Sequence, residues 1–136
     1  MSRFRGAEDL ARYICTNYSG RVVEVGVGHF PDVAAILKTG GMDVILTDKE
    51  SRALGNLTVV KDDIFSPRLE LYRGASLLYS LRPPQELQIG MGSLAIKVGA
   101  DVLIRPLGDE VAILPGFSRR LVNFGETGFF LFRPIR

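Results

Sequence analysis

Cysteine and histidine are almost absent from this sequence. Its 136 residues include one cysteine, Cys15, and one histidine, His29. A single thiol excludes an intramolecular disulfide, and one thiol with one imidazole cannot supply the ligands of a Cys/His zinc site. The chain is therefore compatible with a reducing compartment, and we expect no metal site.

Long apolar runs and charge of one sign are also missing. No stretch approaches the ~20 consecutive apolar residues of a membrane-spanning helix, and the first five residues, MSRFR, lack the apolar core of a secretion signal. The 17 basic and 15 acidic residues are spread along the chain and leave a net charge of +2. No field of one sign attracts nucleic acid, and we expect a cytoplasmic protein that does not contact a membrane.

The composition is otherwise that of an ordinary globular protein. Apolar residues make up 46% and charged residues 24% of the chain, far from the composition of disordered segments. A chain of this length suits one hydrophobic core. The nearest candidate boundary is Pro115-Gly116, and only about twenty residues follow it, too few for a second domain. We therefore expect one domain over residues 1–136.

Strands and helices are predicted to alternate along most of the chain. Short apolar runs predict strands at 21–27, 42–47, 56–61, 75–81 and 101–105. Apolar side chains at helical spacing predict helices over 7–18, from 31 to about 38, and over 85–98. Two more strand-like runs, 120–124 and 128–132, flank Gly125-Glu126-Thr127, which is typical of a hairpin. The predicted class is α/β: a mostly parallel sheet flanked by helices, with a C-terminal antiparallel hairpin.

The first strand ends in a glycine-rich turn, Glu24-Val25-Gly26-Val27-Gly28, before a helix that begins near Pro31. Gly26 permits a tight or left-handed turn, and Gly28 removes a side chain where a ligand would meet the backbone. Free N–H groups at the start of the next helix can receive a carboxylate or phosphate. The pattern indicates a ligand site, with a purely structural strand–helix turn as the alternative.

Acidic residues end the next two predicted strands. Asp48 lies at about the 20-residue offset from Gly26 that suits an acid accepting hydrogen bonds from ribose hydroxyls; the alternative is a cap on the segment that follows. Asp62 and Asp63 end the third strand. They belong to the carboxyl edge, where open α/β sheets bind ligands, and the alternative for each is turn formation or capping.

These residues resemble the first three motifs of class I S-adenosylmethionine-dependent methyltransferases, which have a Rossmann-like fold. The hairpin is similar to the reversed last strands of that fold, and the whole chain resembles a family of small uncharacterised archaeal proteins assigned to it. The resemblance implies S-adenosylmethionine as cofactor, with the glycine turn at its methionine part, the second-strand acid at the ribose and an acid after the third strand at the adenine amino group. Phe30 stands where many members carry a third glycine. The implied cofactor-binding residues are Glu24, Gly26, Val27, Gly28, Asp48, Asp62 and Asp63.

The resemblance is looser after the fourth predicted strand. Arg82 and Gln85 replace the acceptor-binding Asn or Asp and the aromatic residue of the Asn/Asp-Pro-Pro-aromatic motif, so transfer to nitrogen is not supported. Tyr79, Ser80 and Arg82 are candidate catalytic residues because they lie where an acceptor would bind. Their alternatives are a core aromatic, a turn residue and a surface cation. His29 is a candidate for binding a ligand carboxylate or acting as a base, with neither role as the alternative.

The predicted function is an S-adenosylmethionine-binding, methyltransferase-like domain, active or vestigial, with an unidentified acceptor. Methyl transfer needs no protein nucleophile, since it depends on holding acceptor and methyl in line. One alternative is an NAD-binding regulatory module, which Pro31 at the sixth position of Gly-x-Gly-x-x-Gly disfavours. Another is a non-enzymatic interaction module that kept the fold.

Few residues remain beyond the predicted sheet and helices, so we expect acceptor binding to require a homodimer, a partner protein or RNA. Four arginines could dock a large acidic or RNA acceptor: Arg82, Arg105, Arg119 and Arg120.

Overall fold

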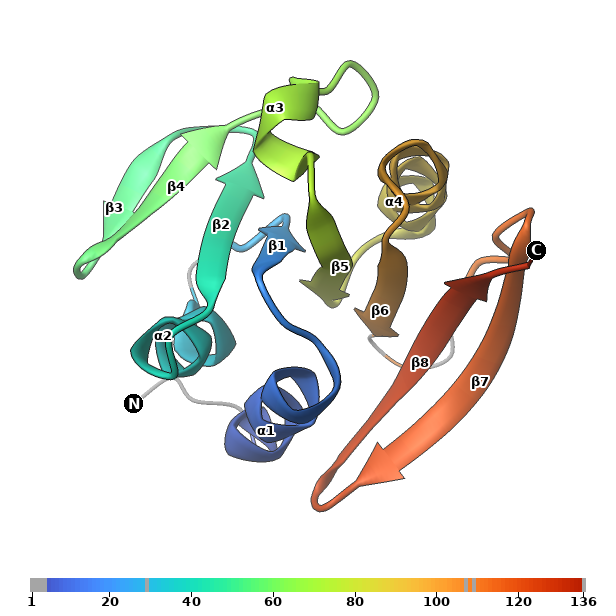
Figure 1. Ribbon diagram of the computed structural model, residues 1–136, viewed down its shortest axis with the longest axis horizontal. Helices are drawn as coiled ribbons and strands as arrows, with labels where there is room; N and C mark the ends of the chain where they lie inside the picture. Colours follow the sequence, from blue (N-terminus) through green and yellow to red (C-terminus); the bar gives the residue numbers. More distant parts are fainter. Residues whose placement is uncertain (1–4, 29, 107, 109, 136) are drawn as a thin grey trace.

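One eight-stranded sheet organises the part of the chain that the computed structural model describes, residues 5–28, 30–106, 108 and 110–135 (Figure 1). The helices are α1 (Ala7–Asn17), α2 (Asp32–Thr39), α3 (Leu69–Tyr72) and α4 (Gln85–Val98). The strands are β1 (Arg21–Val25), β2 (Asp43–Asp48), β3 (Arg52–Leu54), β4 (Leu57–Lys61), β5 (Ala75–Leu81), β6 (Asp101–Arg105), β7 (Phe117–Phe124) and β8 (Thr127–Pro134).

The strand order β3-β4-β2-β1-β5-β6-β8-β7 confirms the predicted fold class. Strands β4, β2, β1, β5 and β6 are parallel, whereas β8 pairs with β6, and β7 with β8, in the antiparallel sense. The chain first builds outward from β1 through β2 to β4 and then crosses to the other side of β1 with β5. The strand order therefore reverses at β1, and in open α/β sheets ligands bind at the carboxyl ends beside such a reversal.

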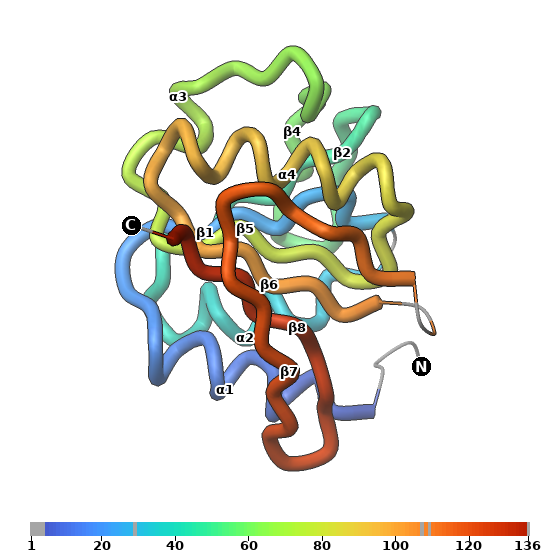
Figure 2. The backbone as a smooth tube through the Cα atoms, turned by 90° about the vertical axis from the view of Figure 1, so that its right-hand side faces the viewer, coloured from blue at the N-terminus to red at the C-terminus, as the bar shows by residue number. Residues whose placement is uncertain are grey.

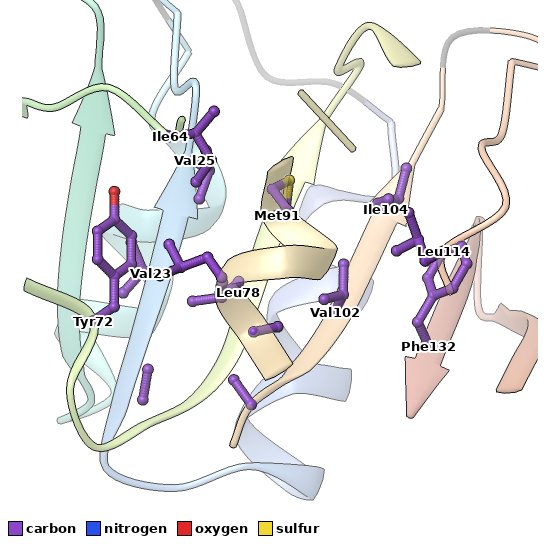
Figure 3. Packing of buried hydrophobic residues seen from close by; sticks show 14 of the residues in the cluster. Val23, Val25, Ile64, Tyr72, Leu78, Met91, Val102, Ile104, Leu114 and Phe132 are labelled. Carbon is purple, nitrogen blue, oxygen red and sulfur yellow. The ribbon is translucent and has the colours of Figure 1, made fainter. Parts of the chain in front are cut away.

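Helices cover both faces of the sheet, which explains why the central strands are mostly apolar. Figure 2 shows α4 on one side of the strands and α1 and α2 on the other. Along β1, Val23 and Val25 pack in the cluster that includes Met91 of α4 (Figure 3), whereas Val22 packs in the cluster that includes Leu10 of α1. No described helix is long and apolar enough to cross a membrane.

Helix α4 has the predicted bounds although two glycines interrupt its apolar pattern. A Cβ atom on Gly90 would lie 3.0 Å from side-chain atoms of Ile64 and Phe65, and one on Gly92 would lie 3.3 Å from Leu114. The glycines therefore let the loop after β4 and the segment before β7 pack closely on the helix. These contacts offset the intrinsic cost of glycine in a helix, about 1 kcal/mol each.

Two short elements were not predicted, β3 and α3. Strand β3 has three residues and pairs antiparallel with β4 through a turn at Gly55, whose φ is 63°. Helix α3 has four residues. Neither is long enough to show a hydrophobic period. The C-terminal hairpin is longer than predicted, because Phe124 pairs with Thr127 across a tight turn and the ladder continues to Phe117 and Pro134.

Candidate functional site

A cleft of about 620 Å³ opens at the carboxyl ends of β1, β2 and β4. This volume is within the usual range of small-molecule sites, about 300–1,000 Å³. Its walls come from the turn after β1, the ends of β2 and β4, the loop after β4, and the start of α4. Among the residues singled out from the sequence, the cleft brings together Gly26, Gly28, Asp48, Asp62 and Asp63.

The turn after β1 presents backbone to this cleft. Gly26 and Gly28 have φ values of 68° and 65°, a conformation that suits glycine. The N–H groups of Gly26 and Val27 donate to the carbonyl of Thr47 at 2.9 and 3.2 Å, which ties the turn to β2. A Cβ atom on Gly28 would meet nothing within 4 Å, so a ligand can approach the backbone there.

Val27 does not line the cleft. It is buried in a separate cluster with Ala34 and Leu46, beneath the turn. Phe30, at the position of the absent third glycine, is 45% exposed. His29 is outside the described residues, so its candidate role stays a prediction.

Asp48 is held by three donors at the end of β2. Its Oδ2 accepts hydrogen bonds from the Gly28 N–H at 3.1 Å and from Arg52 Nη2 at 2.5 Å, and its Oδ1 accepts one from the Lys49 N–H at 2.8 Å. Burial alone would raise the pKa of Asp48, but these donors outweigh it and hold the pKa below its ordinary value. The next regular element is β3 rather than a helix, so Asp48 is not a helix N-cap.

Asp62 and Asp63 line the same cleft but differ in how their carboxylates are engaged. Asp62 accepts a hydrogen bond from the Tyr72 hydroxyl at 2.6 Å and one from the N–H of Arg68 at 3.1 Å, and its side chain is 3% exposed. The Oδ1 atom of Asp63 accepts one hydrogen bond, from the Phe65 N–H at 2.9 Å, and the residue is exposed. Asp62 therefore supports the loop, and Asp63 presents its carboxylate to solvent.

Glu24 is fully buried two residues before the first glycine. Neither of its carboxyl oxygens has a well-formed hydrogen bond with a residue that the structure describes, although the Tyr79 hydroxyl on the neighbouring strand is close enough to act on its pKa. Burial raises the pKa of Glu24 to about 8, with a smaller lowering by the Tyr79 hydroxyl and a further increase from the charge of Asp32. At neutral pH the carboxyl is therefore mainly protonated.

The structure separates the three candidate catalytic residues. Tyr79 is fully buried in the cluster on the α1 and α2 side of the sheet. Ser80 is buried as well, and its hydroxyl donates to the carbonyl of Val25 at 2.6 Å. Arg82 is exposed, with an unusual φ of 61°, and its N–H donates to the carbonyl of Arg105 at 2.8 Å.

The other two arginines considered for docking lie farther along the sheet. Arg119 and Arg120 are exposed on β7, the strand at the edge of the sheet, and Arg119 lies 5.3 Å from the centre of the Phe130 ring. Strand β7 is separated from β1 by β5, β6 and β8. The arginines therefore do not form a single patch.

Sequence reasoning missed two features of the site. Leu87 lies over the glycine turn, where its Cδ2 would be 3.0 Å from a Cβ on Gly26. Arg52 pairs with Asp48 and also donates to the carbonyl of Gly28 at 2.5 Å through Nη2 and 3.2 Å through Nε. The four-residue spacing of Asp48 and Arg52 was the available signal, but in an extended segment that spacing does not by itself predict a contact.

The chain is similar to proteins of one known family. The model of an uncharacterised protein family (UPF0146) matches residues 7–133. A UPF0146 protein of Archaeoglobus fulgidus is 45% identical over 126 residues, which cover 91% of this chain and 92% of that protein.

Solved structures of other proteins share the fold of this chain. The structure of yhhF from Escherichia coli, a candidate methyltransferase, superimposes with a TM-score of 0.65 at 14% identity and covers 98% of this chain and 87% of that chain. The glycopeptide N-methyltransferase MtfA, solved with S-adenosylmethionine, gives a TM-score of 0.54 at 13% identity over 95% of this chain and 66% of that chain. At these identities the likeness is one of fold.

Proposed function

The chain belongs to the UPF0146 family, and from its cleft we propose that it binds S-adenosylmethionine as a methyltransferase domain. The observation that carries the proposal is the convergence of an open glycine backbone with carboxylates from two further strand ends in one cleft of about 620 Å³. The methyltransferase-type fold of the solved structures supports it. When bound, the cofactor supplies a methyl group made electrophilic by its sulfonium.

The residues of the cleft fit such a ligand at its polar end. A ligand can pack against the backbone of Gly28, because a Cβ atom there would meet nothing within 4 Å, while the N–H and carbonyl of this residue are engaged by Asp48 and Arg52. Glu24 does not itself line the cleft; it is fully buried just before the turn, and neither of its carboxyl oxygens has a well-formed hydrogen bond with a described residue. A buried polar group without a partner costs free energy, about 1–3 kcal/mol. A cationic ligand group over the turn would favour the ionised carboxylate and reduce this cost.

We assign the adenosine part of the ligand to residues at the carboxyl ends of β2 and β4. Asp48 retains an acceptor position on Oδ1 for a ribose hydroxyl, because that oxygen accepts only the Lys49 N–H among the described residues. For the adenine amino group we assign Asp63 rather than Asp62, since the Asp62 side chain is 3% exposed and already accepts hydrogen bonds from Tyr72 and Arg68, whereas Asp63 is exposed. The apolar side chains of Ile64, Phe65 and Leu87 also line the cleft and can cover a flat ring.

Few side chains of this chain are available at the end of β5, where a methyl acceptor would bind. Of the three candidates at the end of β5, Arg82 alone is exposed, while Tyr79 and Ser80 are buried. We therefore propose that the protein orients a methyl donor and relies on an acceptor, or a partner that carries it, to provide the deprotonated atom. Arg82 follows β5 and Arg105 is the last residue of the neighbouring strand β6, and both suit an anionic acceptor such as RNA.

The test uses the purified chain with tritium-labelled S-adenosylmethionine and cell extract, sorted into small-molecule, protein and RNA fractions. We expect label in a macromolecular fraction and little in small molecules. A Gly26→Val variant is the control, because its side chain would meet Leu87 and resist a positive φ. Equal labelling by the parent and this variant would contradict a role for the cleft, and efficient methylation of a small metabolite would contradict the need for a larger acceptor.

A further inference from the structure

Arg52 closes a ring of hydrogen bonds around the peptide of Gly28. Asp48 Oδ2 accepts the Gly28 N–H at 3.1 Å, Arg52 Nη2 donates to the same Oδ2 at 2.5 Å, and Arg52 donates to the Gly28 carbonyl at 2.5 and 3.2 Å. Both polar groups of the residue that faces the cleft are therefore held by one ion pair. The side chains of Arg52 and Asp48 are 25% and 20% exposed, so water only partly screens the pair.

The position of Arg52 follows from the element that sequence reasoning did not predict. Arg52 is the first residue of β3, which pairs with β4 and starts opposite Val59. Its Nη1 also donates to the carbonyl of Glu50 at 3.3 Å. The pairing of β3 with β4 and the hydrogen bond to Glu50 thus hold Arg52 beside the end of β2. A planar guanidinium can bridge a carboxylate and a carbonyl at once, which an ammonium group does less well.

A count of acceptor positions on Asp48 shows what this arrangement leaves for a ligand. Each carboxylate oxygen accepts about two hydrogen bonds. The two positions on Oδ2 are taken by Gly28 and Arg52, whereas Oδ1 has one taken by the Lys49 N–H. With Arg52 in place, the described residues leave one position on Oδ1 unoccupied.

We infer that Arg52 is a positioning residue that limits Asp48 to a single ribose hydroxyl, so the cleft distinguishes the 2′- from the 3′-hydroxyl of an adenosine ligand. This inference rests on the proposed function, because it assigns Asp48 to the ribose. A carboxylate with both oxygens available would accept the two hydroxyls together. Replacing Arg52 frees a position on Oδ2 and should remove the distinction.

The experiment compares adenosine, 2′-deoxyadenosine and 3′-deoxyadenosine by calorimetry, with S-adenosylhomocysteine as the reference ligand. For the parent chain we expect one deoxynucleoside to bind about tenfold more weakly than adenosine and the other to bind within about twofold, since tenfold corresponds to about 1.4 kcal/mol. For Arg52→Ala we expect the two deoxynucleosides to bind within about twofold of each other. Arg52→Lys, which keeps the charge, should give an intermediate ratio and serves if the alanine variant does not fold.

A matched control comes from the opposite edge of the sheet. Arg21 pairs with Asp43 at 2.8 Å, donates to backbone carbonyls and is 30% exposed, but it lies at the start of β1. Arg21→Ala should leave the ratio of the two deoxynucleosides unchanged. A similar change in both variants would identify a general loss of structure and overturn the specific role of Arg52.

A ligand-free measurement separates this inference from the proposed function. Carbon-detected NMR titration of the side-chain carboxyl should show the pKa of Asp48 rising in Arg52→Ala but not in Arg21→Ala. The inference is overturned, even if S-adenosylhomocysteine binds, by an unchanged titration of Asp48 in Arg52→Ala. It is also overturned if the parent chain binds 2′-deoxyadenosine and 3′-deoxyadenosine with equally reduced affinity. Absence of binding by every ligand at millimolar concentration overturns the proposed function, and the ribose contact with it.

Discussion

Glu24 is the residue whose replacement should change the pH dependence of stability most. Its folded-state pKa is about 8 because of burial, against an ordinary value of 4.5. Between these two values the folded chain holds a proton that the unfolded chain releases, so folding stability falls as pH rises. The stabilising proton is fully retained below about pH 4.5 and lost by about pH 8. At 1.36 kcal/mol per pH unit the loss amounts to roughly 5 kcal/mol at most.

The variant Glu24→Gln cannot ionise and should lose this dependence. We expect urea unfolding, followed by far-ultraviolet circular dichroism, to give similar free energies for parent and variant at pH 5. At pH 8.5 the variant should be more stable by several kcal/mol. Glu70→Gln, at an exposed carboxyl in α3, is the control and should follow the parent. Parallel pH profiles for the parent and Glu24→Gln would refute the reasoning.

Three further substitutions test the site. Gly26→Val should abolish binding of S-adenosylhomocysteine while the fold is retained by circular dichroism, because the branched side chain would meet Leu87 at a positive φ; unchanged affinity would make the turn purely structural. Asp48→Ala should weaken the binding of S-adenosylhomocysteine by about 1–3 kcal/mol. It should also lower thermal stability, because the N–H groups of Gly28 and Lys49 lose their acceptor. Unchanged affinity together with lower stability would show that Asp48 has a structural role only. Arg82→Gly should stabilise the chain by roughly 0.5–1 kcal/mol in thermal unfolding, since φ is 61° and glycine adopts this region without strain; a loss of stability would show that its side chain contributes to the fold.

Much of the fold could be predicted because its signals are local. Strands β1, β2, β4, β5 and β6 are short apolar runs, and the apolar spacing of residues 85–98 predicts α4 with its observed bounds. Strand β3 could not be found in this way, because its three residues show no period and depend on pairing with β4. The extent of the hairpin was underestimated for a related reason: Ser118 and Arg119, which precede the predicted run of 120–124, are polar residues on an exposed edge strand.

The candidate site could be predicted in position but not in detail. Strand ends and glycines place Gly28, Asp48 and Asp63 at one edge, and the cleft lies there. Asp62 and Asp63 could not be distinguished from the sequence, because the difference depends on where Tyr72 and Arg68 lie in three dimensions. The sequence position of Tyr79, Ser80 and Arg82 does not show which of them is exposed. Tyr79 and Ser80 lie on opposite faces of β5 and are both buried because helices cover both faces of the sheet, whereas Arg82 lies beyond the end of the strand.

The central claim is that the cleft binds S-adenosylmethionine, and amide chemical shifts test it most directly. The chain is titrated with S-adenosylmethionine, S-adenosylhomocysteine and NAD, with affinities measured by calorimetry. The account predicts that both methionine derivatives bind more tightly than NAD and shift the amides of Gly26, Gly28, Lys49 and Phe65, which line the cleft. Tighter binding of NAD, or no shift at these amides with millimolar S-adenosylhomocysteine, would contradict it.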